Sequence, residues 1–147
     1  MREIKFRAWV KEVRENGELQ YGGHMVDTIH SLNFTKVTNL MTGVTPIGIS
    51  CFVPGLFYGR VENLKLDEIE LMQYAERHDK HGKEVYERDI VKALKHNETP
   101  FIREIVWRDG MFWFGNWNWA EFKNIFRELE VLGNAFEHPH LLEGVSQ

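Results

Sequence analysis

The sequence contains one cysteine and no long apolar run. Cys51 has no partner within the chain, so no internal disulfide can form, and a reducing compartment fits best. No apolar run approaches the roughly 20 residues that span a bilayer. Residues 1–5 are too charged to open a signal peptide. These features predict a cytoplasmic protein that does not contact membranes.

The sequence also lacks the common catalytic motifs. It has no Gly-rich phosphate loop, no Ser–His–Asp pattern and no paired-carboxylate motif. Cys51 could act as a nucleophile, but it lies within the apolar segment 49–53, where a buried structural thiol is the better interpretation. The sequence therefore favours a non-enzymatic protein without a cofactor.

The charge and the length set further limits. A net charge of −4 argues against non-specific binding to nucleic acid or anionic membranes, and leaves a local basic patch open. The 147 residues allow one domain or two small ones, with a core that needs no metal or disulfide for folding.

The N-terminal third reads as short strands. Residues 2–9 alternate, with Ile4, Phe6 and Ala8 on one face, which predicts a strand with one buried side. Asn16-Gly17 predicts a tight turn because both residues tolerate positive φ, and 19–21 would return as the second strand of a hairpin. Residues 24–62 are too apolar for a disordered linker, so we expect short strands and ordered loops there.

The stretch 67–92 is the most patterned part of the chain. Periodicity alone allows either a helix or a strand over 67–77. The segment 79–83 predicts a tight turn, with Gly82 at the position that needs positive φ. A β-branched run at 89–92 then indicates a new strand.

An aromatic hairpin is predicted further on. Residues 101–107 and 111–119 read as strands joined at Asp109-Gly110, a type I′ turn signal. A two-residue loop places Trp107, Phe112, Ile105 and Phe114 on one face, and Val106, Trp113, Trp117 and Trp119 on the other. Both faces are apolar, so we expect both to be covered. A short helix or turn over 120–129, a closing strand over 130–134 and an end of regular structure at Pro139 complete the prediction.

Two groups of polar residues could bind metal. The imidazoles of His78 and His81, together with the nearby carboxylates of Glu87 and Asp89, could ligate zinc. A solvated polar turn explains this segment better, with Asp79 and Gly82 at the surface, and we predict no metal. His138 and His140, which flank Pro139, receive the same interpretation.

The aromatic segment could instead stack bases. Phe112, Trp113, Phe114, Trp117 and Trp119 resemble a single-strand-binding platform in composition. Such platforms need interleaved cations, and only Arg103, Arg108 and Lys123 are close in sequence. Packing in the core or at an interface is therefore favoured.

Three segments resemble the YopX family of phage and prophage proteins. They are the opening 1–9, the central 71–91 with Leu71-Met72-Gln73-Tyr74 and Gly82-Lys83-Glu84, and the ending with Gly133-Asn134, Glu137, Pro139 and Leu141-Leu142. Residues 23–65 show no such similarity. Departures from the family's usual residues occur at Val10, Ala75-Glu76, His81 and Arg88. The family has Thr-Gly at 75–76, which favours a strand into residue 75, and Gly at 88.

The resemblance implies a mainly β protein of phage origin. It implies an SH3-like β-barrel C-terminal domain over 67–147, preceded by a β-rich N-terminal segment over 1–66, and it brings no established activity. We predict an accessory protein of the bacterial host cytoplasm that acts through protein–protein contacts. Nucleic-acid binding through the barrel's aromatic hairpin is the alternative.

The apolar surface predicts self-association. A small barrel buries one face of the hairpin, and the other must be covered by the N-terminal segment or by another copy. We expect a homo-oligomer, with a trimer as the first choice, alongside an unidentified protein partner. Trp113, Trp117, Trp119 and Phe57 are the candidate contact residues.

Overall fold

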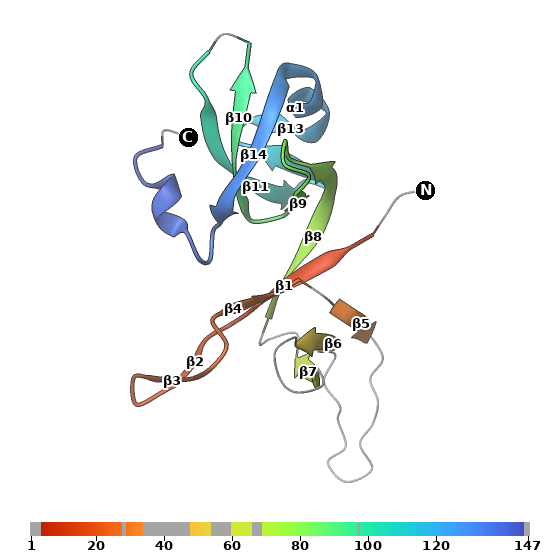
Figure 1. Cartoon of the computed structure of the whole chain (residues 1–147), viewed down its shortest axis with the longest axis vertical. Helices are drawn as coiled ribbons and strands as arrows, with labels where there is room; N and C mark the ends of the chain where they lie inside the picture. Colours follow the sequence, from red (N-terminus) through yellow and green to blue (C-terminus); the bar gives the residue numbers. More distant parts are fainter. Residues whose placement is uncertain are drawn as a thin grey trace. The chain divides into compact units, whose positions relative to one another are not determined.

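The structure, a computed structural model, describes residues 4–27, 29–33, 48–53, 60–65, 69–96 and 98–145 (Figure 1). The chain forms two compact units, one of Met1–Lys5 with Gln73–Gln147 and one of Phe6–Met72. These are the C-terminal and the N-terminal unit, respectively. The domain division at 66/67 stays a prediction.

The N-terminal unit consists of short antiparallel strands. They are β1 (Phe6–Val10), β2 (Val13–Glu15), β3 (Glu18–Tyr21), β4 (His24–Val26), β5 (Ile29–Asn33), β6 (Gly48–Val53), β7 (Arg60–Lys65) and the first part of β8 (Ile69–His78). β1 pairs with β4, β2 with β3, and β6 lies between β5 and β7. Ala8, Val10, Val26 and Ile69 form its buried cluster.

The predicted N-terminal strand and turn are both present. The strand starts at Phe6, so the prediction that Ile4 lies on the buried face is wrong, and this side chain is 67% exposed. The turn at Asn16-Gly17 has φ values of 52° and 84°, as a type I′ turn requires, and it connects β2 to β3.

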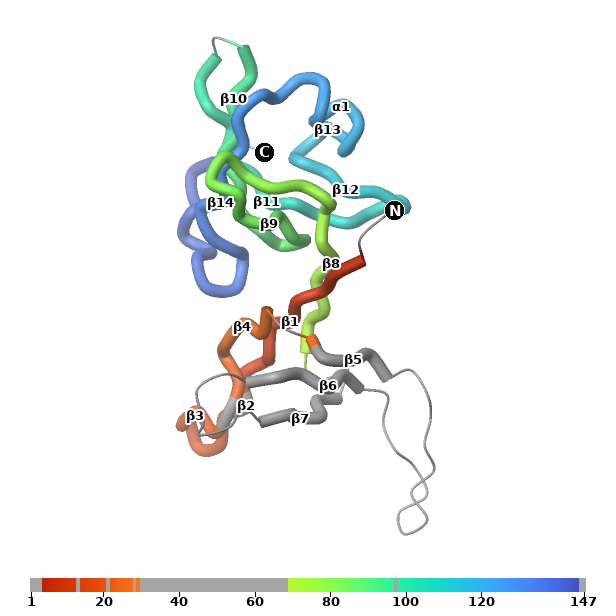
Figure 2. Tube along the Cα trace, turned by 45° about the vertical axis from the view of Figure 1, so that its right-hand side comes forward, coloured from red at the N-terminus to blue at the C-terminus, as the bar shows by residue number. Residues whose placement is uncertain are grey.

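The C-terminal unit contains the rest of the regular structure. Its elements are residues 73–78 of β8, β9 (Glu84–Tyr86), β10 (Asp89–Lys95), β11 (Phe101–Arg108), β12 (Met111–Phe114), β13 (Trp117–Asn118), α1 (Trp119–Ile125), β14 (Phe126–Asn134) and a 3-10 helix (Pro139–Leu142). Five strands form one curled sheet in the order β13-β12-β11-β10-β14, whose trace Figure 2 follows. The mainly β prediction and the strand at 69–78 are confirmed, while the SH3-like topology stays a prediction.

The core of this unit is aromatic. Phe114, Phe122 and Phe126 are buried and lie within 5.1 Å of one another between ring centroids. Trp119 stacks on Phe122 at 4.9 Å and donates its indole N–H to the Ala75 carbonyl. Clusters of this kind bury large apolar area with specific ring geometry, so they fix how α1 packs on the sheet.

A capping box explains why α1 begins where it does. The Asn118 side chain accepts hydrogen bonds from the backbone N–H groups of Ala120 and Glu121, and the Glu121 carboxylate accepts one from the Asn118 N–H. The predicted helix over 120–129 is too long. Phe126 and Leu129 belong to β14, where pairing with β10 buries them. Pro139 begins the 3-10 helix, so the prediction that regular structure ends there is also wrong.

The register of the aromatic hairpin is confirmed. Arg108 pairs with Met111, Trp107 with Phe112 and Ile105 with Phe114. The second strand does not continue to 119, however, because a turn at Gly115-Asn116 interrupts it and Gly115 has φ of 58°. Consequently Trp117 pairs with Phe114 and packs against the core. The predicted second face is wrong for Trp117 and Trp119.

Two departures from the family's glycines fall on left-handed backbone. Glu76 has φ of 55° and Arg88 has φ of 68°, a region where a Cβ is strained. Arg88 is held there by several contacts. Its backbone N–H donates to Ile105, its carbonyl accepts from Ala135, and its guanidinium lies over the Phe136 ring.

Candidate functional site

The polar turn after β8 is organised by one buried carboxylate. Asp79 is 8% exposed, so the prediction that it lies at the surface is wrong, while Gly82 is exposed with φ of 82°. The Oδ1 atom of Asp79 accepts hydrogen bonds from the His81 and Lys83 N–H groups, and its Oδ2 accepts one from Val131 on β14. Sequence reasoning identified the turn but not the remote partner, which is 52 residues away.

These bonds change the acidity of Asp79. Burial opposes ionisation, but the backbone N–H groups of Val131, Lys83 and His81 outweigh it and lower the pKa of Asp79. The carboxylate therefore stays charged and ties the turn to β14. We assign it a structural role.

A second polar cluster surrounds Glu84 on β9. Its carboxylate accepts hydrogen bonds from Lys5 Nζ and from the Tyr86 hydroxyl, and these two bonds lower the pKa of Glu84. Tyr74 lies beside it, with its ring 5.5 Å from that of Tyr86 and its hydroxyl 3.4 Å from His78 Nδ1. The cluster joins residues 5, 74 and 84–86 within one unit.

The candidate metal ligands do not converge. Within the described ranges, no group of three or more His, Cys, Asp or Glu side chains is placed to hold a metal ion. His78 and His81 are exposed, whereas Asp89 is buried and accepts a hydrogen bond from the Tyr86 N–H. At the C-terminal end, the His138 ring nitrogen accepts a hydrogen bond from the Asn134 N–H. Cys51 lies in β6, opposite Ile29 and Glu62.

The β11–β12 hairpin exposes large apolar side chains at its tip. Trp107 is 39% exposed and Met111 is 41% exposed, on either side of Asp109-Gly110. Trp107 also contacts Phe112 edge-on, with ring centroids 4.8 Å apart. We call Trp107 and Met111 the hairpin tip. The hairpin below it is anchored in the core, so the tip is presented on a fixed support.

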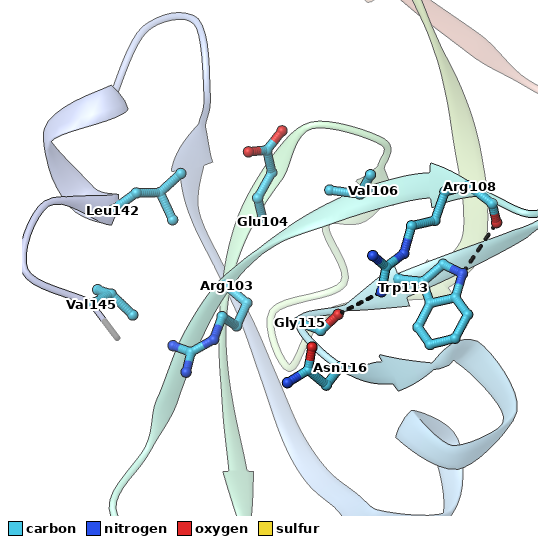
Figure 3. Close-up of a pocket in the computed structure, with 9 residues that line it drawn as sticks. All are labelled: Arg103, Glu104, Val106, Arg108, Trp113, Gly115, Asn116, Leu142 and Val145. Atoms are coloured by element: carbon cyan, nitrogen blue, oxygen red, sulfur yellow. Dashed lines mark hydrogen bonds between the residues drawn. The ribbon is translucent and has the colours of Figure 1, made fainter. Parts of the chain in front are cut away.

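A pocket of about 210 Å³ lies on the outer side of the same hairpin (Figure 3). It is lined by Arg103, Glu104, Val106, Arg108, Trp113, Gly115, Asn116, Leu142 and Val145. The Arg108 guanidinium lies 4.3 Å from the centre of the Trp113 ring, and the Trp113 indole N–H donates to the Arg108 carbonyl. We call this hollow the arginine pocket. Its residues come from β11, β12, the turn after β12 and the C-terminal segment.

The charges around the arginine pocket are unevenly paired. Glu104 pairs with Arg88. Arg103 donates to the Ile102 carbonyl, and Arg108 lies 3.4 Å from the Gly115 carbonyl oxygen. Across the described part of the chain, neither Arg103 nor Arg108 has an acidic partner within ion-pair distance. The pocket therefore presents two uncompensated guanidinium groups beside an indole.

The predicted contact residues lie in different environments. Trp113 is half-buried and lines the arginine pocket, while Trp117 is half-buried against the core. Trp119 is 9% exposed within the core, and Phe57 lies outside the described residues. Sequence reasoning missed Trp107 and Met111, although their position beside the predicted turn was a usable signal. It did not bring Arg103 and the C-terminal residues together, because their proximity depends on tertiary structure.

These features define a small, mainly β protein whose C-terminal unit is a curled sheet with one α-helix beside β13 and β14, among the elements described (Figure 1). The chain belongs to the YopX protein family, whose pattern matches residues 5–143. The crystal structure of protein EF1440 from Enterococcus faecalis is similar in fold, with a TM-score of 0.54 and 22% sequence identity. The similarity covers 96% of this chain and 99% of that one. No curated protein matches this sequence.

The helices of the described residues are short. None of them has the length and the apolar composition that crossing a membrane would need.

Proposed function

We propose that this chain is a phage or prophage accessory protein that works without catalysis, through contacts with other proteins in the host cytoplasm. The observation that carries the proposal is the hairpin tip. Trp107 and Met111 flank the turn on opposite faces of a hairpin whose Ile105, Phe112 and Phe114 side chains are buried in an aromatic core. Trp and Met are enriched at protein–protein interfaces, where burying their large apolar side chains favours binding.

Self-association is part of the same proposal. A symmetric homo-oligomer would cover an exposed apolar tip on every copy at once, and most soluble oligomers are of this kind. We propose a trimer in which the hairpin tip and Trp113 lie at or near the contact. Light scattering at micromolar concentration should then give about three times the chain mass of 17.4 kDa. A monomeric mass that is independent of concentration would contradict self-association.

The partner contact is tested with matched variants of the whole chain. Trp107→Thr with Met111→Thr removes the apolar tip and keeps residues that suit a strand. Leu19→Thr is the control, because Leu19 is 48% exposed on the other hairpin. Affinity capture from phage-infected cells should recover a protein with wild type and Leu19→Thr that the tip variant loses. Equal recovery by all three would exclude the tip as the contact.

Nucleic-acid binding is the second candidate. The stacking of Arg108 on Trp113, with Arg103 in the same pocket, provides an indole and two cations side by side. Base stacking on aromatic residues between cations is how single-strand binders hold nucleic acid. Fluorescence anisotropy with a labelled ten-nucleotide oligo-dT at two salt concentrations tests it. Salt-sensitive binding that Arg108→Gln abolishes would favour this candidate over the first.

A further inference from the structure

We propose that the arginine pocket binds the C-terminal residue of a protein chain, with the α-carboxylate between Arg103 and Arg108 and an apolar side chain against Leu142 and Val145. This names a ligand for a site that the hairpin tip does not include. It extends the proposed function, since the ligand belongs to a protein. Its test uses residues outside the tip, so the two proposals can fail separately.

The side chains of two arginines, Arg103 and Arg108, flank the Gly115-Asn116 turn. A Cβ added to Gly115 would lie 3.3 Å from Arg103 Nε, and Arg108 is 3.4 Å from the Gly115 carbonyl oxygen. In Figure 3 the Arg108 guanidinium is directed toward Gly115, whereas Arg103 lies on the other side of the turn with its guanidinium directed away from it. Both cations attract an anion at this turn, and guanidinium groups bind carboxylates through paired hydrogen bonds.

The pocket wall also contains an acidic residue, Glu104. Glu104 would repel an anion if its charge were uncompensated, but its carboxylate accepts a hydrogen bond from Arg88. Figure 3 shows the Glu104 side chain directed away from Arg103 and Arg108. The side of the pocket around Gly115 is therefore electropositive.

The size and the composition of the pocket limit the ligands that it can hold. A volume of about 210 Å³ is below the roughly 300 Å³ at which drug-sized ligand sites begin, so it suits one amino-acid residue. Val106, Leu142 and Val145 give it an apolar wall. A C-terminal Leu or Val carries a carboxylate and an apolar side chain on one carbon atom, whereas the side chains of Asp and Glu offer only the carboxylate.

A neighbouring hollow shares two residues with the pocket. Arg103 and Val145 also line a wider depression with Thr99, Pro100 and Phe101. A peptide that ends in the arginine pocket can place its preceding residues there. A nucleic acid fits less well, because Glu98 and Glu104 lie along this surface and the two arginines form no extended basic stripe.

The test uses the full chain labelled with ¹⁵N and N-acetyl-L-leucine as the probe. N-acetyl-L-leucinamide is the matched probe without the carboxylate. We expect saturable shifts of the Gly115 and Asn116 amides and of the Trp113 indole N–H with the acid, and binding at least tenfold weaker with the amide. Equal binding of acid and amide would overturn the proposal.

Variants assign the effect to the cations. Arg103→Gln leaves the Arg108–Trp113 stack in place, and it should weaken binding of the acid about tenfold, as expected for loss of a charge-assisted hydrogen-bond pair. Arg127→Gln is the control, because Arg127 is an exposed arginine on β14 outside the pocket. It should bind within twofold of wild type. Unchanged binding by Arg103→Gln would overturn the proposal.

Three competing ligands complete the test. Inorganic phosphate that binds as tightly as the acid would show a general anion site. An acetylated and amidated Leu-Glu-Leu peptide that binds more tightly would show an acidic side-chain site. An oligo-dT that displaces the acid at lower concentration would show a nucleic-acid site. Each of these results would overturn the assignment to a C-terminal residue.

Discussion

The two predicted hairpins have the same turn and different surroundings. Asn16-Gly17 and Asp109-Gly110 both begin with a residue at φ of 52° followed by a left-handed glycine. In the β2–β3 hairpin, the side chains described over 14–20 are all exposed, whereas β11–β12 contributes Ile105, Phe112 and Phe114 to the core. Turn chemistry therefore sets where the chain reverses, and the apolar pattern of the strands sets whether the hairpin becomes part of a core.

The largest expected difference between the hairpins comes from truncating a buried side chain. Phe114→Ala should lower the free energy of unfolding of its unit by about 4 kcal/mol, because Phe114 is fully buried between Phe122 and Phe126. Leu19→Ala on the exposed hairpin should cost less than about 0.5 kcal/mol. Urea unfolding followed by tryptophan fluorescence and circular dichroism measures both. Similar losses would show that the β2–β3 hairpin is also covered.

The next expected effect concerns Asp79, which links a turn to the sheet that contains β11–β12. Asp79→Asn should cost about 2 kcal/mol at pH 7, because an amide nitrogen cannot accept one of the three backbone hydrogen bonds. The folded-state pKa of Asp79 is lowered, so its stabilisation is present above the unfolded value near 3.8 and is lost as pH falls through the folded value.

The measurement is urea unfolding between pH 7 and pH 2.5. Wild type should lose stability below about pH 4. Asp79→Asn should lose less over the same range, although a slope remains because the pKa of Glu84 is also lowered. Identical dependence of stability on pH in the two proteins would exclude Asp79 as a source of the stability lost at low pH.

The two turns should respond alike to the same change. Asn16→Ala and Asp109→Ala each place a less tolerant residue at φ of 52°, so each should cost about 1 kcal/mol in its own unit. Gly82→Ala, at φ of 82°, should also destabilise. Thermal unfolding of each variant measures this. A cost at 109 only would indicate that the exposed hairpin adds nothing to the stability of its unit.

The smallest expected effect is a gain. Glu76→Gly relieves a Cβ held at φ of 55° on an exposed position, and it should stabilise the C-terminal unit by about 0.5 kcal/mol. Arg88→Gly relieves similar strain but removes the ion pair with Glu104 and the contact with Phe136, so it should not stabilise. A loss of stability in Glu76→Gly would contradict the strain argument.

Local sequence patterns predicted where the chain reverses and the register of the β11–β12 hairpin. The features that they did not predict depend on tertiary contacts. The two-residue loop at Asp109-Gly110 fixed the pairing of Trp107 with Phe112, because pairing follows from loop length. The predicted alternation of side chains between the two faces fails after Phe114. A second turn at Gly115 changes the face on which the following side chains lie. Phe126 and Leu129 have helical spacing, yet pairing with β10 makes them a strand.

The candidate site was predicted less completely than the fold. The aromatic hairpin drew attention to Trp113, but nothing local in the sequence indicated that Leu142 and Val145 approach Arg103. Such proximity depends on the path of the chain after β14. The exposed fraction of Trp107 likewise depends on how far the hairpin extends beyond the core.

The two oxygens of Asp79 have a consequence for the order of folding. Oδ1 binds residues within four positions, so these bonds form when the local turn closes. Oδ2 binds Val131, which requires closure of a loop of 52 residues, and such contacts carry the larger entropic cost. We expect the Lys83 amide to gain protection from hydrogen exchange early in refolding and the Val131 amide to gain it only when β14 docks. The hydrogen bonds of this one side chain therefore form at both an early and a late stage of folding.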